Sequence, residues 1–123
     1  MNAQIKQQWI NDLRSGNYNQ TIGQLMEEDE DGTRAFCCLG VLTDQYLKAN
    51  NKGWDDNMEN SNYKYRSEGI LPCEVKEWAG LYERDPTIID DGYLQCLSTI
   101  NDDRGWDFNQ ISDVIEKSNF EPE

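Results

Sequence analysis

The sequence contains no histidine and has few basic residues. Without histidine there is no Ser-His-Asp or Cys-His catalytic pair, no histidine-ligated zinc and no histidine pH switch. Lysine and arginine together number 11 against 24 acidic residues, so the 123-residue chain carries a formal net charge of −13. Proteins that bind nucleic acid or anionic lipid directly need clustered lysine and arginine. The charge therefore argues against both kinds of binding.

Several segments and motifs are also missing. No apolar run approaches the roughly 18 residues of a membrane span. The N-terminus, Met1–Lys6, lacks the basic and then apolar layout of a secretory signal. The sequence has no glycine-rich phosphate loop, no nucleophile elbow and no glutamate-paired metal motif. We therefore expect a cytoplasmic protein that acts by binding, is not an enzyme, and uses no metal or cofactor.

The four cysteines do not form a metal or redox motif. Cys37 and Cys38 are adjacent, and Cys73 and Cys96 stand alone, so no pair has the Cys-x-x-Cys spacing. Adjacent cysteines rarely bridge each other, because the geometry strains the peptide between them. The sequence favours four reduced thiols over a metal site or a disulfide framework. We expect at least Cys37, Cys38 and Cys96 to be buried.

Length and aromatic content predict one folded domain over residues 1–123, although the mean hydropathy is −0.89. Apolar residues recur at helical spacing in several segments. The predicted helices are Asn2–Ser15, a central buried helix from about Cys37 to Asn50, a third that opens at Leu71-Pro72 and ends at Gly80, and a last one that Asp107 and Gln110 can cap. The spacing of Leu94, Leu97 and Ile100 also predicts a helix over Tyr93–Asn101.

Two short segments between Thr21 and Phe36 flank an acidic turn that ends in Asp31-Gly32, which predicts an antiparallel hairpin. Tyr63 and Tyr65 alternate around a lysine, as in a short strand, and Tyr82–Gly92 reads as a loop. The predicted fold class is α+β: a mostly helical single domain of about four helices with a small antiparallel hairpin or sheet.

Gly40 lies inside the most apolar run of the chain, where alanine would favour the helix by about 1 kcal/mol. We expect the backbone of another element to approach the central helix closely at this glycine.

The acidic turn is the first candidate site. It consists of Glu27, Glu28, Asp29, Glu30 and Asp31. Its spacing does not match an EF-hand loop, which disfavours calcium binding. A solvated hairpin tip is the simpler interpretation, and a negative patch that meets a basic partner protein is the third.

Loop aromatics and arginines are the candidate ligand-binding residues. Aromatic rings stack on nucleobases, and arginine offers the forked donors that a phosphate accepts. The same residues are also typical of core edges, helix caps and weak surface ion pairs. Arg34 and Arg66 come first, because they flank predicted strands. The full set is Arg34, Arg66, Trp54, Tyr63, Tyr65, Asn101, Asp102, Arg104 and Trp106.

The segment Phe36-Cys37-Cys38-Leu39-Gly40-Val41-Leu42 resembles a widespread group of small, mostly uncharacterised proteins encoded by tailed bacteriophages. The resemblance covers most of the chain, including Trp9, Leu13–Gly16, Leu71-Pro72, Trp78–Leu81, Ile100–Asp102 and the Ile111–Ile115 helix. Members of the group usually carry a short, often basic turn between the positions of Leu25 and Phe36, where this chain has an acidic one.

The resemblance implies a phage protein in the host cytoplasm, and small phage proteins of this kind often inhibit host defence. One hypothesis is a non-enzymatic sponge, a homo-oligomer, that sequesters a nucleotide immune signal. The alternative is an acidic nucleic-acid mimic that blocks the basic groove of a host defence nuclease or CRISPR effector. A structural role in the phage is a third interpretation.

Overall fold

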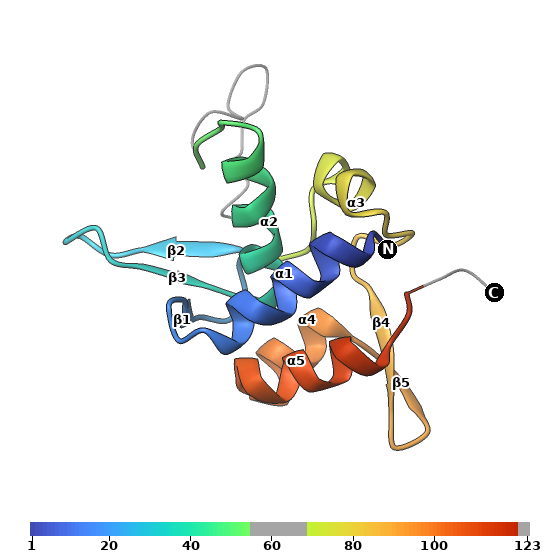
Figure 1. Cartoon of the computed structure of the whole chain (residues 1–123). Helices are drawn as coiled ribbons and strands as arrows, with labels where there is room; N and C mark the ends of the chain where they lie inside the picture. Colours follow the sequence, from blue (N-terminus) through green and yellow to red (C-terminus); the bar gives the residue numbers. More distant parts are fainter. Residues whose placement is uncertain (55–68, 121–123) are drawn as a thin grey trace.

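The computed structural model describes residues 1–54 and 69–120, which form helices and two small sheets (Figure 1). The helices are α1 (Ala3–Arg14), α2 (Cys38–Ala49), α3 (Cys73–Ala79), α4 (Leu97–Asp102) and α5 (Phe108–Lys117). The strands are β1 (Asn19–Gln20), β2 (Met26–Glu28), β3 (Arg34–Phe36), β4 (Thr87–Asp90) and β5 (Tyr93–Cys96). The predicted α+β class is confirmed. Every helix in the described ranges is too short or too polar to cross a bilayer.

Helix α2 is the centre of the core, as its apolar sequence predicts. Every residue from Cys38 to Leu47 is buried, including three with polar side chains. The indole nitrogen of Trp9, on α1, donates to the carbonyl of Cys38 at 2.9 Å, which joins the two helices inside the core. A helix that is buried on all sides needs partners for its polar groups, and the neighbouring segments supply them.

The start of α2 lies directly against the chain that leads into β2. A Cβ atom on Gly40 would stand 1.8 Å from the carbonyl oxygen of Leu25, so no other residue fits there without a backbone shift. The same carbonyl accepts a hydrogen bond from the backbone nitrogen of Cys37 at 3.3 Å. The predicted close approach at Gly40 is confirmed, and its partner is the backbone at Leu25.

The predicted hairpin is present, but it belongs to a three-stranded sheet of order β1-β3-β2. Strands β2 and β3 are antiparallel, with Met26 opposite Phe36 and Glu28 opposite Arg34. Strand β1 pairs with β3 in parallel and was not predicted from the sequence, because a two-residue strand has no hydrophobic pattern. In Figure 1 the β2–β3 hairpin projects away from the helices.

The region between α3 and α4 corrects two predictions. Tyr82–Gly92 is not a continuous loop, and helix does not begin at Tyr93, because β4 and β5 form an antiparallel hairpin there. The turn residues Asp91 and Gly92 both have positive φ, 51° and 82°, as the tightest hairpin turn requires. Leu94 belongs to β5 and is exposed, so its helical spacing to Leu97 was coincidental.

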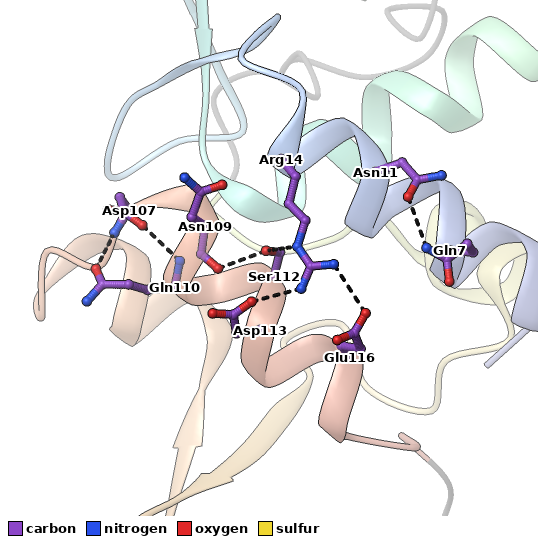
Figure 2. Close-up of polar contacts among 9 residues, drawn as sticks. All are labelled: Gln7, Asn11, Arg14, Asp107, Asn109, Gln110, Ser112, Asp113 and Glu116. Atoms are coloured by element: carbon purple, nitrogen blue, oxygen red, sulfur yellow. Dashed lines mark hydrogen bonds and ion pairs between the residues drawn. The ribbon is translucent and has the colours of Figure 1, made fainter.

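Helices α1 and α5 pack side by side, and their predicted caps are present. Asn2 caps α1 by accepting from the backbone nitrogen of Ile5, and Asp107 and Gln110 form a capping box at the start of α5. Figure 2 shows how Arg14 joins the two helices: its guanidinium donates to Ser112, Asp113 and Glu116 on α5. Beneath these contacts Trp9, Ile10, Leu13, Ile111 and Ile115 are buried, and Ile5 and Val114 are partly buried against them.

All four cysteines are free thiols, as predicted. Cys37 and Cys38 are buried, and burial raises the pKa of the Cys37 thiol to about 12. The burial prediction is wrong for Cys96, which is only partly buried because it ends a hairpin strand and does not face the core from a helix. Cys73, at the start of α3, is exposed.

The contact at Gly40 makes a stability prediction. Gly40→Ala should lower the free energy of unfolding by about 3 kcal/mol, because the added methyl group forces the Leu25 backbone away from α2. Gly69→Ala is the matched control, since its Cβ would lie 3.7 Å from the nearest atom, and it should change stability by less than about 0.5 kcal/mol. Urea unfolding followed by circular dichroism measures both. Equal stabilities of the two variants would contradict the close contact.

Candidate functional site

A cavity of about 640 Å³ lies between α1, α2 and strand β3. Its size is within the range of small-molecule sites. Polar side chains dominate the lining, together with two aromatic rings. The lining residues are Gln8, Asp12, Asn17, Tyr18, Arg34, Phe36, Asp44, Gln45 and Lys48.

The carboxylate of Asp44 is the most buried charge in this lining, at 6% exposure. One of its oxygens accepts from the Tyr18 hydroxyl at 2.6 Å and meets the Lys48 ammonium at 2.8 Å. The other accepts from the indole nitrogen of Trp54 at 3.0 Å. A buried charge is tolerated when donors surround it in this way. The site therefore contains a carboxylate whose charge is already compensated by the protein.

The carboxylate of Asp12, on α1, is also saturated by neighbouring side chains. Its two oxygens accept from the carboxamide nitrogens of Gln8 at 3.1 Å and Gln45 at 2.6 Å. The carbonyl oxygen of the Gln45 side chain is buried and has no hydrogen-bond partner, and it is the only such side-chain atom in the part of the chain that the structure describes. An acceptor left unpaired in this way is stabilised by a donor from outside the chain.

The exposed charged groups of the lining are cations. The side chain of Arg34 is 43% exposed and that of Lys48 is 70% exposed. Arg34 uses its Nε atom for an ion pair with Glu28 at 3.0 Å, and no hydrogen bond to its two terminal nitrogens is present within the described residues. These nitrogens and the remaining protons of Lys48 are available to an acceptor on a ligand.

The two aromatic rings of the lining contact each other beside these cations. Tyr18 meets Phe36 edge to face, with ring centroids 5.0 Å apart. The Lys48 ammonium lies 5.5 Å from the centre of the Tyr18 ring. The two carboxylates and two cations of the lining cancel formally, whereas the whole chain carries −13. The lining of this cavity is therefore formally neutral, and it repels an anionic ligand less than the net charge of the chain implies.

Of the predicted ligand-binding residues that the structure describes, only Arg34 lines this cavity. Trp54 was predicted to be a stacking platform, but it is 3% exposed and packs against Phe36, with ring centroids 5.9 Å apart. Its indole nitrogen is committed to Asp44. Trp54 thus packs beneath Phe36 and Asp44 of the lining, and its ring is not accessible to a ligand. Arg66, Tyr63 and Tyr65 lie outside the described residues.

Asn101 and Asp102 also lie outside the cavity lining, and Asn101 has a structural role. Asn101 is fully buried, and its side-chain oxygen accepts from the backbone nitrogen of Cys38 and from Gln20. Its side-chain nitrogen donates to the carbonyl of Thr21 and to the carboxylate of Asp102. The Asn101 carboxamide holds three chain segments together, and this structural role leaves no donor or acceptor for a ligand.

Arg104 and Trp106 lie together but not at the cavity. The guanidinium of Arg104 is 5.1 Å from the centre of the Trp106 ring and donates to Gln95 and Asp90. Neither residue belongs to the cavity lining. Both residues lie in the segment between α4 and α5, and their contact with each other was not predicted from the sequence.

The sequence analysis missed Tyr18, Asp44 and Lys48. A signal for two of them is present in the sequence: Asp44 interrupts the most apolar helix, and Lys48 follows it by one helical turn. An acidic residue on a buried helix needs a donor, and the residue four positions later faces the same side. Tyr18 carries no such signal, because only the fold brings it to α2.

The acidic residues Glu27, Glu28, Asp29, Glu30 and Asp31 are all exposed on the projecting β2–β3 hairpin (Figure 1). Asp31 accepts from the backbone nitrogen of Thr33, which lowers the pKa of its carboxyl group. No group of three or more metal-ligating side chains occurs within residues 1–54 and 69–120. The hairpin therefore presents carboxylates to solvent without a metal-binding arrangement in the described part of the chain.

The contact between Tyr18 and Asp44 predicts an unusual titration. Burial and the Asp44 carboxylate raise the pKa of the Tyr18 phenol well above its ordinary value of about 10. The neutral phenol therefore stabilises the fold at lower pH, and this contribution is lost as the pH rises above about 10 toward the pKa of the folded state. The tyrosinate absorbance of the wild type, minus that of Tyr18→Phe, should show this late ionisation. A difference spectrum that titrates at the ordinary value would contradict the buried hydrogen bond.

Comparisons with known proteins give a family and no function. No curated protein and no solved structure matches the chain. A family model, described as a domain of unknown function (DUF8296), matches residues 1–119. The match includes every helix and strand described above, and with them the whole cavity lining. The chain therefore belongs to the DUF8296 family.

Proposed function

We propose that this protein is a phage-encoded, non-enzymatic binding protein that counters host antiviral defence by sequestering a nucleotide immune signal in the cavity around Asp44. The observation that carries the proposal is the distribution of charge in the lining. Its carboxylates are saturated by Tyr18, Trp54, Lys48 and two glutamines, while its exposed charges are cations. In a chain of net charge −13, such a site selects an anion that fits the cavity.

The lining supplies the contacts that a small nucleotide needs. The terminal nitrogens of Arg34 and the ammonium of Lys48 would donate to phosphate oxygens, which are strong charge-assisted hydrogen bonds. The rings of Tyr18 and Phe36 would contact a base. The unpartnered side-chain oxygen of Gln45 would accept from a donor such as an exocyclic amine.

The biological part of the proposal rests on sequence resemblance. The Phe36–Leu42 segment is similar to small proteins of tailed bacteriophages, and this similarity supports a phage protein that acts in the host cytoplasm during infection. A binding protein with no catalytic constellation acts there by mass action, so it must be abundant relative to the signal that it captures.

The proposal predicts that Arg34→Ala and Lys48→Ala each weaken nucleotide binding about tenfold to hundredfold, because each removes charge-assisted donors from a phosphate. Arg104→Ala is the matched control, since this arginine lies outside the cavity lining and should leave the affinity unchanged. Isothermal titration of a panel of cyclic mononucleotides, cyclic dinucleotides and ADP-ribose measures the affinities. If no member of the panel binds the wild type, or if Arg104→Ala weakens binding equally, the proposed function is wrong.

A second function is favoured by the projecting hairpin, which carries five consecutive exposed acidic residues. This surface would imitate nucleic acid and block the basic groove of a host defence nuclease or CRISPR effector. Replacing Glu27–Asp31 by the corresponding amides should slow association with a basic nuclease by about tenfold or more at low salt, and less at high salt. Stopped-flow mixing at both salt concentrations measures the rate. An association rate that the amide substitutions leave unchanged would rule this function out.

A further inference from the structure

Large apolar side chains are exposed at one end of the molecule, around the β4–β5 hairpin. Within the described residues, five large hydrophobic side chains are exposed, and four of them lie here: Tyr82 at 62%, Ile89 at 71%, Tyr93 at 72% and Leu94 at 70%. Ile89 and Leu94 are directly opposite each other in the register of the two strands, so their side chains lie together on one face. Monomeric proteins rarely leave such a cluster uncovered.

Three of these four side chains belong to a groove of about 830 Å³ between β4 and the end of α5, and Tyr93 lies outside its lining. Tyr82, Ile89 and Leu94 line it together with Leu81, Pro86 and Phe120. Both neighbouring isoleucines of β4 contribute to the lining: Ile88 is 2% exposed and belongs to the core, whereas Ile89 is 71% exposed. The hairpin that carries the groove projects from the helices at the lower right of Figure 1, on the other side from the β2–β3 hairpin.

We infer that this groove is the interface of a homodimer, and that a second copy of the chain covers it. The charges of the groove support a second copy. Among the residues that the structure describes, the charged members of its lining are one acid, Glu83, and one base, Lys117. In a two-fold interface every contact between two different residues occurs twice, once in each direction. Glu83 of one copy can therefore pair with Lys117 of the other copy, and Lys117 of the first with Glu83 of the second. The pair of opposite charges makes the groove complementary to itself.

The balance of charge also favours a second copy over a basic partner protein. A chain of net charge −13 repels its own copies over most of its surface, but the groove lining carries no net charge. A basic partner is drawn instead to the acidic residues 27–31, which lie on the other hairpin. Association through the groove thus brings two acidic molecules together where repulsion is least and exposed apolar area is greatest.

Such a dimer leaves the cavity around Asp44 open. The cavity is lined by residues 8–48, and the groove by residues 81–94 and 117–120, so the two share no lining residue. Each dimer would present two independent cavities. The inferred dimer does not depend on what the cavity binds, so an experiment that rules out the dimer leaves the proposed function untouched, and the reverse.

Sedimentation velocity of the full chain from micromolar to millimolar concentration tests the dimer. The wild type should pass from monomer to dimer over this range, and Leu94→Asp should raise the dissociation constant about tenfold or more by placing an uncompensated charge in the apolar interface. Ile22→Asp is the matched control: it adds the same charge at another exposed hydrophobic residue, 60% exposed and outside the groove, and should dimerise like the wild type.

The paired charges give a second measurement. Lys117→Glu should weaken the dimer, and the double variant Lys117→Glu with Glu83→Lys should restore it, because the exchange preserves the pairing across the two-fold axis. Circular dichroism confirms that each variant is folded. A wild type that stays monomeric at millimolar concentration would overturn the inference. So would an Ile22→Asp variant that weakens the dimer as much as Leu94→Asp, or a double variant that dimerises no better than Lys117→Glu.

Discussion

The contact between Gly40 and the Leu25 carbonyl is the constraint on which the rest of the structure depends. A central helix that carried any side chain at this position could not lie against the segment that enters β2. Because it does, the Leu25 carbonyl accepts from Cys37, and the backbone of Thr21 donates to the carbonyl of Phe36 at 2.8 Å. The sheet is thereby attached to the first turn of α2, and the aromatic ring of Phe36 reaches the cavity.

Buried polar side chains join further segments of the chain to α2. The Asn101 carboxamide joins α4 to the start of α2 and to the chain beside β1, and the Asp44 carboxylate joins α2 to Tyr18 and Trp54. Each group would destabilise the core if it were unpaired, and each is satisfied by segments distant in sequence. The cavity thus has walls fixed by hydrogen bonds, and its exposed cations, Arg34 and Lys48, stand on two rigid elements.

Charge is distributed unevenly over this small molecule, and the three surfaces discussed above differ in it. The β2–β3 hairpin is acidic, the cavity has exposed cations over compensated carboxylates, and the groove beside β4 is apolar with one charge of each sign. The net charge of −13 is a sum over the whole chain and does not give the local charge of any of these three surfaces. Under the two proposals above, this segregation would keep the binding of an anionic ligand and self-association at separate places on the chain.

Local sequence determined most of the helical fold. The apolar stripes of α1, α2 and α5, the polar caps of α1 and α5, the Asp31-Gly32 hairpin and the close approach at Gly40 all follow from periodicity, capping and turn chemistry, which act over a few residues. The β4–β5 hairpin was misread, because the spacing of Leu94, Leu97 and Ile100 fits a helix until the Asp91-Gly92 turn is considered. The candidate site depends on the tertiary structure almost entirely. Tyr18, Arg34 and Asp44 are far apart in the sequence, and only the packing of α2 against α1 and β3 brings them to one cavity. The burial of Trp54 and Asn101 could not be predicted either. Local sequence does not reveal whether the fold exposes a polar or aromatic side chain or buries it with partners from other segments.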